Sequence, residues 1–341
     1  PIGVVGAIPP WNFPLMLALR KVGPALAAGC PVILKPASAT PLCAIQFAEA
    51  VHEAQLPPGV FQLVVGRADE IAAEMLENPL CRKISFTGST EVGRKLIRGA
   101  ADQVTKLSLE LGGHAPVLVF DDADLNAAVQ GVLMAKFRNT GQSCIAANRV
   151  YVQRSVYPQF LEQLVARTRA LKIGNGLEEG VEIGPLIGQR ALDQALAHID
   201  QAVSAGAKVL CGGRRWPGEP RGCFLEPTIL ADAPPDALCM REETFAPIAP
   251  VAVFDSEDEA VQKANATDYG LAAYVFTRDL GRAWRLAEAL EAGTVCINES
   301  VPATSQCPFG GTKHSGWGRE LGCEGLDGYL ETKHISLRID D

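Results

Sequence analysis

Residues 83–95 read KISFTGSTEVGRK, and this stretch decides the fold. Residues 83–86 are expected to form a strand, Thr87-Gly88-Ser89 follows as a tight connection, and a helix begins after Ser89. Amide groups at the start of such a helix point toward a bound anion, so the stretch predicts a phosphate site; an ordinary capped helix is the alternative. Arg94 stands where a P-loop needs lysine, and a GxGxxG fingerprint is absent, which disfavours a nucleoside triphosphatase.

The same succession of apolar runs and amphipathic stretches continues along the chain. Further strands are expected at residues 2–8, 31–34, 60–65, 106–110, 116–120, 149–152, 208–210, 227–230, 248–254, 272–276 and 294–298. Further helices are expected at residues 16–28, 40–54, 69–77, 124–139, 157–171, 189–205, 257–266 and 280–290. Strand–helix–strand repetition at this spacing implies a parallel sheet with helices on its faces.

Local features refine this organisation. Thr40 is expected to cap the helix that follows it, with Pro41 at the first helical position. The glycine-dense residues 307–328 predict a structured loop with close backbone approaches, and residues 329–339 predict a final strand. The composition changes most at Gly112-Gly113, which marks the expected domain boundary.

Composition and charge exclude several classes of function. The 341 residues are 48% hydrophobic, and 39 acidic against 31 basic residues give a net charge of −8. This charge argues against a general nucleic-acid binder, because such proteins neutralise phosphates with lysine and arginine. No apolar run reaches the about 18 residues that a membrane span needs, and the chain opens without a signal peptide. We therefore expect neither nucleic-acid nor membrane partners.

Cysteine and histidine spacing predicts no metal site. The 10 cysteines are scattered without a CxxC pair, the 5 histidines show no metal spacing, and GxSxG is absent. Taken singly, each cysteine is expected to be a small buried hydrophobe in a reducing cytosol. The chain opens directly on a core strand without an initiator methionine, so we expect an upstream segment to be absent from this sequence.

Four residues stand in patterns that suit chemistry. Cys144 lies in a polar Gly-Gln-Ser-Cys loop at the end of a long helix, as an accessible nucleophile requires. Glu110 stands between leucines, where a carboxyl pKa tends to rise and suits a general base; a strand-edge carboxylate bonded to backbone is the alternative. Asn12 in Pro-Trp-Asn-Phe-Pro either stabilises an oxyanion or closes a turn. Lys35 either reaches a phosphate or ribose or extends to solvent.

Seven segments together resemble the aldehyde dehydrogenase superfamily. They are PWNFP (10–14), LKPAS (34–38), FTGSTEVG (86–93), LELGG (109–113), NTGQSC (139–144), EETFAP (242–247) and PFGGTKHSGWGRE (308–320). Their order and spacing match over essentially the whole chain, and KFRNTGQSC, DDADL and IGPLI make it most similar to succinate-semialdehyde dehydrogenases. The resemblance implies an α/β, aldehyde-dehydrogenase-like fold. Its parts would be a partial Rossmann-type cofactor domain at residues 1–112, an α/β catalytic domain at 113–315, and a return segment with a C-terminal oligomerisation strand at 316–341.

The resemblance also implies roles for individual residues. Cys144 would be the nucleophile and Glu110 the general base, and Asn12 with the backbone N–H of Cys144 would hold the oxyanion. Such chemistry oxidises an aldehyde through a thiohemiacetal and a thioester, and Glu110 favours hydrolysis over transfer to coenzyme A. The implied cofactor-binding residues are Trp11, Lys35, Ser38, Gly88, Ser89, Gly112, Glu243 and Phe245.

Cofactor choice depends on Ser38. Family members that prefer NAD commonly carry glutamate at this position, and that charge repels a 2′-phosphate. Serine leaves room and a donor, so NADP is expected to be preferred and NAD to be accepted. Ala246 replaces the glycine usual in EETFGP and adds a methyl group beside Glu243 and Phe245.

The expected substrate is succinate semialdehyde, which would be oxidised to succinate. Relatives that act on it hold the distal carboxylate with two arginines, which by position are Arg20 and Arg138. Thr304, Ser305 and Phe309 complete the expected substrate site. A glutarate-semialdehyde or broad-range dehydrogenase and an inactive truncated fragment are the alternatives. We further expect a cytoplasmic homo-oligomer, either a dimer or a tetramer.

Overall fold

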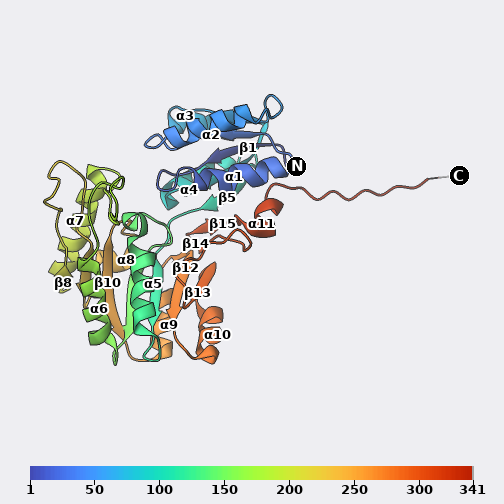
Figure 1. Cartoon of the computed structure of the whole chain (residues 1–341). Coiled ribbons are helices and arrows are strands. Elements are labelled where there is room, and N and C mark those ends of the chain that lie inside the picture. Colours follow the sequence, from blue (N-terminus) through green and yellow to red (C-terminus); the bar gives the residue numbers. More distant parts are fainter. Residues whose placement is uncertain (340–341) are drawn as a thin grey trace. The chain divides into compact units, whose positions relative to one another are not determined.

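The computed structural model describes residues 1–339 and divides them into two compact units (Figure 1). Unit 1 comprises residues 1–111, 304–310 and 316–339, and unit 2 comprises residues 112–303 and 311–315. Residues 304–310, which we assigned to the catalytic domain, therefore belong to the same unit as the N-terminal strands. Residues 340 and 341, the end of the expected return segment, lie outside the described residues.

Unit 1 is built on a six-stranded sheet in the order β15-β5-β4-β1-β2-β3. Its strands are β1 (Val4–Ile8), β2 (Val32–Leu34), β3 (Phe61–Leu63), β4 (Cys81–Thr87), β5 (Lys106–Glu110) and β15 (Gly316–Trp317). Its helices are α1 (Met16–Ala27), α2 (Leu42–Glu53), α3 (Ala68–Glu77), α4 (Thr90–Ala100) and α11 (Gly322–Asp327). Strands β1 to β5 pair in parallel, and β15 pairs antiparallel with β5. Val5 and Leu34 are fully buried and pack with Val22 of α1, so burial of aliphatic side chains holds this layer together.

Unit 2 is built on a seven-stranded sheet in the order β13-β12-β6-β7-β10-β9-β8. Its strands are β6 (Ala115–Val119), β7 (Ala147–Gln153), β8 (Lys208–Cys211), β9 (Thr228–Ala231), β10 (Ile248–Phe254), β12 (Ala272–Phe276) and β13 (Thr294–Ile297). Its helices are α5 (Leu125–Phe137), α6 (Tyr157–Arg169), α7 (Gln189–Ser204), α8 (Leu238–Arg241), α9 (Glu257–Asn265) and α10 (Leu280–Ala289). Strands β11 (Tyr269–Gly270) and β14 (Thr312–Lys313) form a separate two-stranded sheet.

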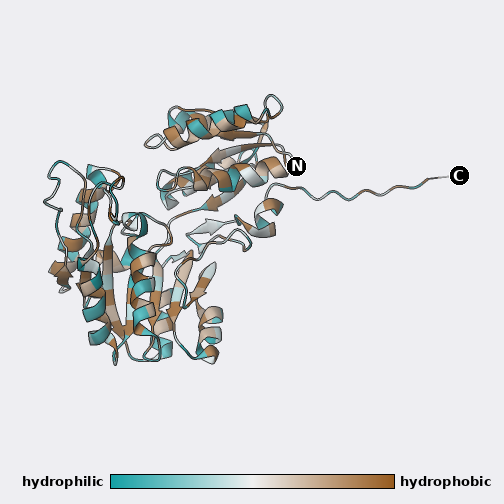
Figure 2. Cartoon of the chain, viewed as in Figure 1, coloured by the Kyte–Doolittle hydropathy of each residue, from teal (hydrophilic) through white to brown (hydrophobic). Residues whose placement is uncertain are grey.

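Helices cover both faces of the sheet in unit 2. Successive side chains of a strand point to opposite faces, so Val150 and Val152 pack with α5 and α6, whereas Tyr151 packs with residues of α7 to α10. Figure 2 shows the result: the strands of this sheet are mostly hydrophobic, and the helices carry hydrophilic residues as well. Continuous apolar runs are typical of strands that are buried on both faces.

The strands and helices expected from the sequence are confirmed except for the last strand, and each observed bound lies within two residues of the expected one. Both main sheets are predominantly parallel, with antiparallel pairing at β15 and β8. The elements that the sequence did not predict are the short ones: α8, β11, β14, β15, α11 and the 3-10 helix η1 (Arg138–Gly141). An element of a few residues is too short to show a periodic hydrophobic pattern.

Thr40 does not cap α2, contrary to expectation. Pro41 occupies the cap position, and no side chain makes a cap hydrogen bond there. The Thr40 hydroxyl instead donates to the carbonyl oxygen of Trp11 at 3.4 Å. The side chain therefore ties the loop after β1 to the start of α2.

The final strand expected at residues 329–339 is wrong. The carbonyl of buried Tyr329 accepts a hydrogen bond from the amide of Ile2 at 2.9 Å, but residues 330–339 are exposed and carry no strand. A strand is stabilised by backbone hydrogen bonds to a neighbour, and in the part of the chain that the structure describes no strand pairs with this segment. Its role in oligomerisation stays a prediction.

Two expectations from composition can be compared with the structure. No helix among the described residues is long and apolar enough to cross a membrane. The expectation of buried cysteines is confirmed for Cys30, Cys81, Cys211, Cys239 and Cys296. It is wrong for Cys43, Cys307 and Cys323, which are exposed, because a short polarisable side chain is also tolerated on a helix surface or in a loop.

Candidate active site

The parallel strands of unit 1 end at one edge of their sheet, and most residues expected to bind the cofactor follow those ends. Carboxyl ends of parallel strands lie at the same edge, which is where α/β proteins bind ligands. Trp11 and Asn12 follow β1, Lys35 and Ser38 follow β2, Gly88 and Ser89 follow β4, and Glu110 is the last residue of β5. The topology therefore gathers residues that lie up to about a hundred positions apart in the sequence.

Ser89 caps the helix that follows β4. Its hydroxyl accepts a hydrogen bond from the amide of Val92 at 3.3 Å, and the amide of Gly88 donates to the carbonyl of Glu110 at 3.0 Å. The start of this helix is thus held in register with the last residue of β5. The capped helix is what the structure contains, and the phosphate role of Ser89 stays a prediction.

Lys35 does not extend into solvent. Its side chain is buried, its amide donates to the carbonyl of Ala7 at 2.9 Å, and burial lowers the pKa of its amine. A buried amine gains from an anionic or hydroxylated ligand because its own charge is poorly hydrated. Ser38, three residues further, is exposed.

Glu110 is a buried carboxyl group. It is 4% exposed, and its Oε2 has no hydrogen-bond partner. Burial raises the pKa of Glu110 well above its usual range, the charge of Glu320 raises it further, and Lys21 is the first of the cations that oppose the shift. A carboxyl group with a raised pKa is a better proton acceptor once it is ionised, which is the property of a general base.

Two residues beside Glu110 were not predicted from the sequence. Lys21 is fully buried in α1 and donates to Thr87 Oγ1 at 2.6 Å and to the carboxylate of Glu320. Glu320 is also buried. We call Glu110, Lys21, Thr87 and Glu320 the Glu110 cluster. One signal was present: Lys21 falls on the helix face whose other members, such as Leu17 and Val22, are buried.

Arg20 and Phe309, both expected at the substrate, lie together in unit 1. The Arg20 guanidinium carbon lies 4.9 Å from the centroid of the Phe309 ring, and its Nη1 lies 4.0 Å from the carboxylate of Glu320. Phe309 and Glu320 exchange two backbone hydrogen bonds of 2.7 Å, which fixes this loop next to the Glu110 cluster. Thr304 and Ser305 precede Phe309 and are exposed.

In unit 2, Cys144 ends a strained turn. We call residues 138–144 the nucleophile turn. Helix α5 stops at Phe137, and Asn139 and Thr140 then adopt φ angles of 51° and 59°, followed by Gly141 at 73°. Left-handed backbone is costly for a β-branched residue such as threonine, about 1–3 kcal/mol, and persists only where the surroundings enforce it. Cys144 itself is partly buried.

The segment 184–187 supplies that enforcement. The Thr140 hydroxyl donates to the carbonyl of Gly184 at 3.2 Å and accepts from its amide at 3.1 Å. The Gln142 side chain accepts from the amide of Ile187 at 2.8 Å and donates to the carbonyl of Pro185 at 3.3 Å. In the sequence, Thr140 and Gln142 stood out only as part of the family resemblance. In the structure, their hydrogen bonds to the segment 184–187 hold the backbone of the nucleophile turn in place.

Glu243 and Gly112 are also located in unit 2. Glu243 Oε1 accepts a hydrogen bond from the amide of Gly113 at 3.0 Å, and the carbonyl of Gly112 accepts one from Ser315 Oγ at 2.7 Å. Burial raises the pKa of Glu243 to about 7. Phe245, two residues on, has a φ of 45°, so its backbone is strained as in the nucleophile turn.

The second predicted arginine, Arg138, begins the nucleophile turn and is exposed. It lines a cavity of about 560 Å³ between α5 and α6 that also contains Met134 and Arg167. Arg20 belongs to unit 1 and Arg138 to unit 2. Their joint action on one carboxylate stays a prediction.

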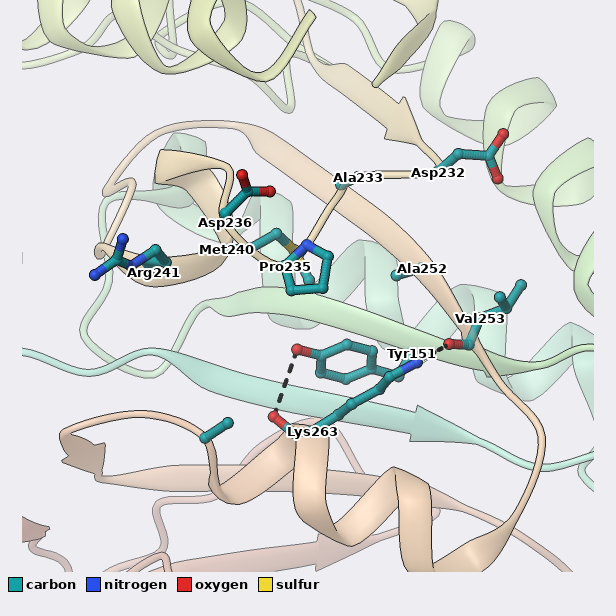
Figure 3. A pocket seen from close by; sticks show the side chains of 11 residues that line it. Tyr151, Asp232, Ala233, Pro235, Asp236, Met240, Arg241, Ala252, Val253 and Lys263 are labelled. Carbon is teal, nitrogen blue, oxygen red and sulfur yellow. Dashed lines mark hydrogen bonds between the residues drawn. The ribbon is translucent and has the colours of Figure 1, made fainter. Parts of the chain in front are cut away.

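A further cavity of about 600 Å³ lies over strands β7 and β10 of unit 2 (Figure 3). Tyr151 lies along it, and its hydroxyl donates to the carbonyl of Lys263 at 3.5 Å, while the Lys263 amine donates to the carbonyl of Val253 at 2.7 Å. The described residues that line this cavity include none of the residues predicted for catalysis, cofactor or substrate. The volume of a cavity alone therefore does not identify the candidate active site.

Comparison with protein families gives one match over nearly the whole chain. Residues 1–335 match the model described as the aldehyde dehydrogenase family. A glutarate-semialdehyde dehydrogenase of Pseudomonas aeruginosa is 52% identical over 337 residues, which are 99% of this chain and 69% of that protein. A succinate-semialdehyde dehydrogenase of Escherichia coli K12, named for NADP(+), is 51% identical over 339 residues, 99% of this chain and 70% of that protein.

Solved structures agree with this match. An aldehyde dehydrogenase from Brucella melitensis biovar abortus superposes with a TM-score of 0.96 at 51% identity, over 98% of this chain and 68% of that one. An NADP-dependent enzyme from E. coli superposes with a TM-score of 0.95 at 51% identity, over 97% of this chain and 68% of that one. The expected fold class is therefore confirmed, and the chain belongs to the aldehyde dehydrogenase family of NAD(P)-dependent oxidoreductases.

Proposed function

We propose that this chain oxidises a short aldehyde with a distal carboxylate, succinate semialdehyde first, to the corresponding acid. The observation that carries the proposal is the buried Glu110 carboxyl, whose pKa burial raises and whose Oε2 has no partner. Such a group suits the activation of water, so the reaction ends in hydrolysis. In overall balance, aldehyde, water and oxidised cofactor give acid, reduced cofactor and a proton.

The first step uses Cys144. Its thiolate adds to the aldehyde carbon and gives a tetrahedral thiohemiacetal, and the Asn12 side chain and the Cys144 amide stabilise the oxygen that becomes negative. The enforced backbone of the nucleophile turn supports this role, because a fixed nucleophile loses little freedom on reaching the reactive geometry. Loss of hydride then leaves a thioester on Cys144.

The cofactor fits the chemistry of the residues present. We propose that the capped start of α4 with Ser89 and Gly88 binds the pyrophosphate, Lys35 an adenine-side hydroxyl or phosphate, and Glu243 the nicotinamide ribose hydroxyls. Trp11, Gly112 and Phe245 would border the same ligand. When bound, the nicotinamide ring accepts the hydride that the thiohemiacetal releases.

The second step uses Glu110. The carboxylate takes a proton from water as the water oxygen attacks the thioester carbon. The C–S bond then breaks, which releases the acid and returns Cys144 to its thiolate form. The charges of Glu320 and Lys21 act on this carboxyl group in opposite directions, Glu320 raising its pKa and Lys21 lowering it. Because Glu110 supplies the base, hydrolysis is favoured over acyl transfer to coenzyme A.

Ser38 supports NADP as the preferred cofactor, with NAD also accepted. Its exposed hydroxyl follows Lys35 at the sheet edge, and no carboxylate stands at this position to repel a 2′-phosphate. The name of the E. coli relative, which includes NADP(+), is consistent with this choice.

Arg20 and Arg138 support a carboxylated substrate. A guanidinium that stacks on Phe309 is held in place and can bind a carboxylate through two parallel hydrogen bonds. Relatives at almost equal identity are named for succinate and for glutarate semialdehyde, so glutarate semialdehyde is the second candidate. We propose the cytoplasm as the compartment and a homo-oligomer as the assembly.

Steady-state rates test the proposal. Succinate semialdehyde, glutarate semialdehyde and propanal would be compared with NADP and NAD, with Cys144→Ala as the blank. Arg20→Ala and Arg138→Ala are expected to raise the KM for the carboxylated aldehydes by about tenfold to a hundredfold and to leave propanal unchanged. Arg167→Ala, which alters the same cavity as Arg138, is the matched control. Unchanged selectivity in both variants contradicts the substrate assignment, and absence of turnover with every aldehyde contradicts the proposal itself.

A further inference from the structure

A buried lysine stands at the centre of a ring of hydrogen bonds in unit 2. Lys136 Nζ donates to Asn148 Oδ1 at 2.8 Å and to Thr244 Oγ1 at 3.1 Å, and the Thr244 hydroxyl donates to Asn148 Oδ1 at 2.7 Å. Asn148 Nδ2 donates to the carbonyl of Gly113 at 3.4 Å, and the Gly113 amide donates to Glu243 at 3.0 Å. Since Thr244 follows Glu243, the ring closes. We call it the Glu243 ring.

The ring joins three segments to which the proposed function assigns chemistry. Lys136 lies on α5, two residues before the nucleophile turn. Asn148 lies on β7, four residues after Cys144, and Gly113 packs so closely on the Cys144 carbonyl that a side chain there would clash with it. Glu243 and Thr244 precede the strained backbone of Phe245. One amine therefore touches the supports of both the nucleophile and the expected ribose ligand.

Burial of an amine requires compensation. Lys136 is 0% exposed, and burial lowers its pKa to about 7 while the charge of Glu243 acts in the opposite direction. Burial likewise raises the pKa of Glu243, and the Gly113 amide and Lys136 oppose that rise. Each group is thus a counter-charge that opposes the neutralisation of the other in a poorly solvated place.

The other titratable groups around the ring do not replace this pair. Burial lowers the pKa of His114 and of His198, so both imidazoles are neutral near pH 7, and burial raises the pKa of the Cys239 thiol to about 11. Arg149 uses its guanidinium on the carbonyls of His114, Lys263 and Ala264. Glu242 faces His198 and is exposed.

We propose that Lys136 is a positioning residue that keeps the Glu243 carboxylate ionised and fixed on the Gly113 amide, ready to accept the ribose hydroxyls of the cofactor. The inference rests on the proposed role of Glu243. It adds a group that touches neither substrate nor cofactor, and it explains why a lysine is fully buried two residues before the nucleophile turn. Cofactor affinity then depends on pH through Lys136.

Equilibrium binding of NADP⁺ and NAD⁺, measured by calorimetry between pH 5.5 and 9, tests the proposal without turnover. For the natural chain, affinity is expected to fall at acid pH as Glu243 takes up a proton. Lys136→Met is expected to move this fall to higher pH by about one unit, which from a pKa of about 7 means about fivefold weaker binding at pH 7 and recovery by pH 9. Lys136→Arg keeps the positive charge and is expected to stay near the natural profile.

Two further variants keep the test decisive. Glu243→Gln is expected to weaken binding and to remove the pH dependence, and adding Lys136→Met to it should then cause no further loss. Asn148→Asp keeps the oxygen that accepts from Lys136 and Thr244, loses the hydrogen bond to the Gly113 carbonyl, and gives Lys136 a second carboxylate. The acid limb should again move upward, even if Lys136→Met proves too unstable to measure.

The outcomes separate the inference from the proposed function. Equal weakening by Lys136→Met at every pH, with Glu243→Gln still impaired, overturns the inference and leaves the proposed function standing. Binding that is indifferent to Glu243→Gln overturns both the ribose role and the inference. Failure of the natural chain to bind either cofactor overturns the proposed function as well.

Discussion

In both units a glutamate whose pKa burial raises lies near a fully buried lysine, but the number of carboxyl groups differs. In the Glu110 cluster, Lys21 and, 4.0 Å from Glu320, Arg20 face two buried carboxyl groups, Glu110 and Glu320. In the Glu243 ring, Lys136 faces Glu243 alone, and a backbone amide adds a hydrogen bond. The neighbouring Glu320 favours a proton on Glu110, whereas in unit 2 Lys136 and the Gly113 amide oppose the protonation of Glu243. The difference suits a base that exchanges protons in unit 1 and a hydrogen-bond acceptor in unit 2.

Replacing each glutamate by its amide gives the largest contrast. Glu110→Gln is expected to lower steady-state turnover by about 10²–10⁴-fold, because the thioester then lacks a base to activate water. The first turnover should survive as a burst of reduced cofactor. Glu243→Gln should instead weaken cofactor binding and keep hydrolysis competent.

Rapid mixing that follows reduced cofactor separates the two amide variants. Cys144→Ala, which forms no thiohemiacetal, is the control without a burst. A Glu110→Gln variant that loses its burst along with its turnover contradicts the assignment of Glu110 to hydrolysis.

Replacing each lysine by methionine tests the count of charges. Lys21→Met removes the cation that is hydrogen-bonded to Glu320 and leaves two buried carboxyl groups, with Arg20 at 4.0 Å from Glu320 as a remaining cation. The variant is expected to destabilise the chain by about 3–5 kcal/mol. Lys136→Met leaves one carboxyl group, which can take up a proton near neutral pH, so the loss should be smaller. Denaturant unfolding at pH 7 measures both. Equal losses of unfolding free energy in the two variants argue against an effect of the second buried carboxyl group in unit 1.

Much of the fold was predictable because long apolar runs and amphipathic stretches carry their own periodicity. The expected final strand at residues 329–339 was wrong, since a strand depends on a neighbour that a local pattern does not contain. The cap at Thr40 was wrong because Pro41 occupies the cap position, and the Thr40 hydroxyl donates to a carbonyl of the distant Trp11 loop instead. Local sequence patterns therefore predict helices and strands well, but they predict poorly which distant segments these elements pair or bond with.

The candidate site was predictable where motifs carry it, as at Cys144 and Glu110. The supporting residues were not, because their contacts join positions far apart in the chain: Lys21 meets Glu320 across 299 positions and Lys136 meets Thr244 across 108. A charged residue on an otherwise apolar helix face is the one sequence signal that both lysines share. This signal predicts that the charged residue is buried, but it does not predict which residue it bonds with.

The glycine beside each carboxylate gives a smaller contrast. A Cβ at Gly113 would run into the backbone carbonyl of Cys144, whereas a Cβ at Gly310 would lie 2.9 Å from the Glu110 carboxylate and 2.7 Å from the carbonyl of Gly318. Overpacking of this kind costs about 1–3 kcal/mol. Gly113→Ala is expected at the upper end, because its Cβ would approach a backbone carbonyl more closely than the Cβ of Gly310→Ala would. Thermal unfolding and cofactor affinity of both alanine variants check the order.

The smallest expected effect is a dependence of stability on pH. The folded pKa of Glu110 lies above its ordinary value of 4.5, so the folded chain keeps a proton that the unfolded chain has lost. The folded state then binds more protons, and stability falls as pH rises from 4.5 through the folded pKa. Glutamine carries no such proton, so Glu110→Gln should melt about 2–4 °C higher than the natural chain at pH 8 and equally at pH 4.

Glu243→Gln should show no such gain at pH 8. It also removes a carboxylate whose pKa burial raises, but it leaves Lys136 buried without its counter-charge, and burial has lowered the pKa of that amine to about 7. The folded chain then binds fewer protons than the unfolded chain above about pH 7, so the lysine alone makes stability rise with pH, opposite to Glu110. Melting curves between pH 4 and 9 compare the two amide variants. A gain at pH 8 in both would mean that Lys136 does not depend on Glu243, and the contrast between the units would then rest on Glu110 alone.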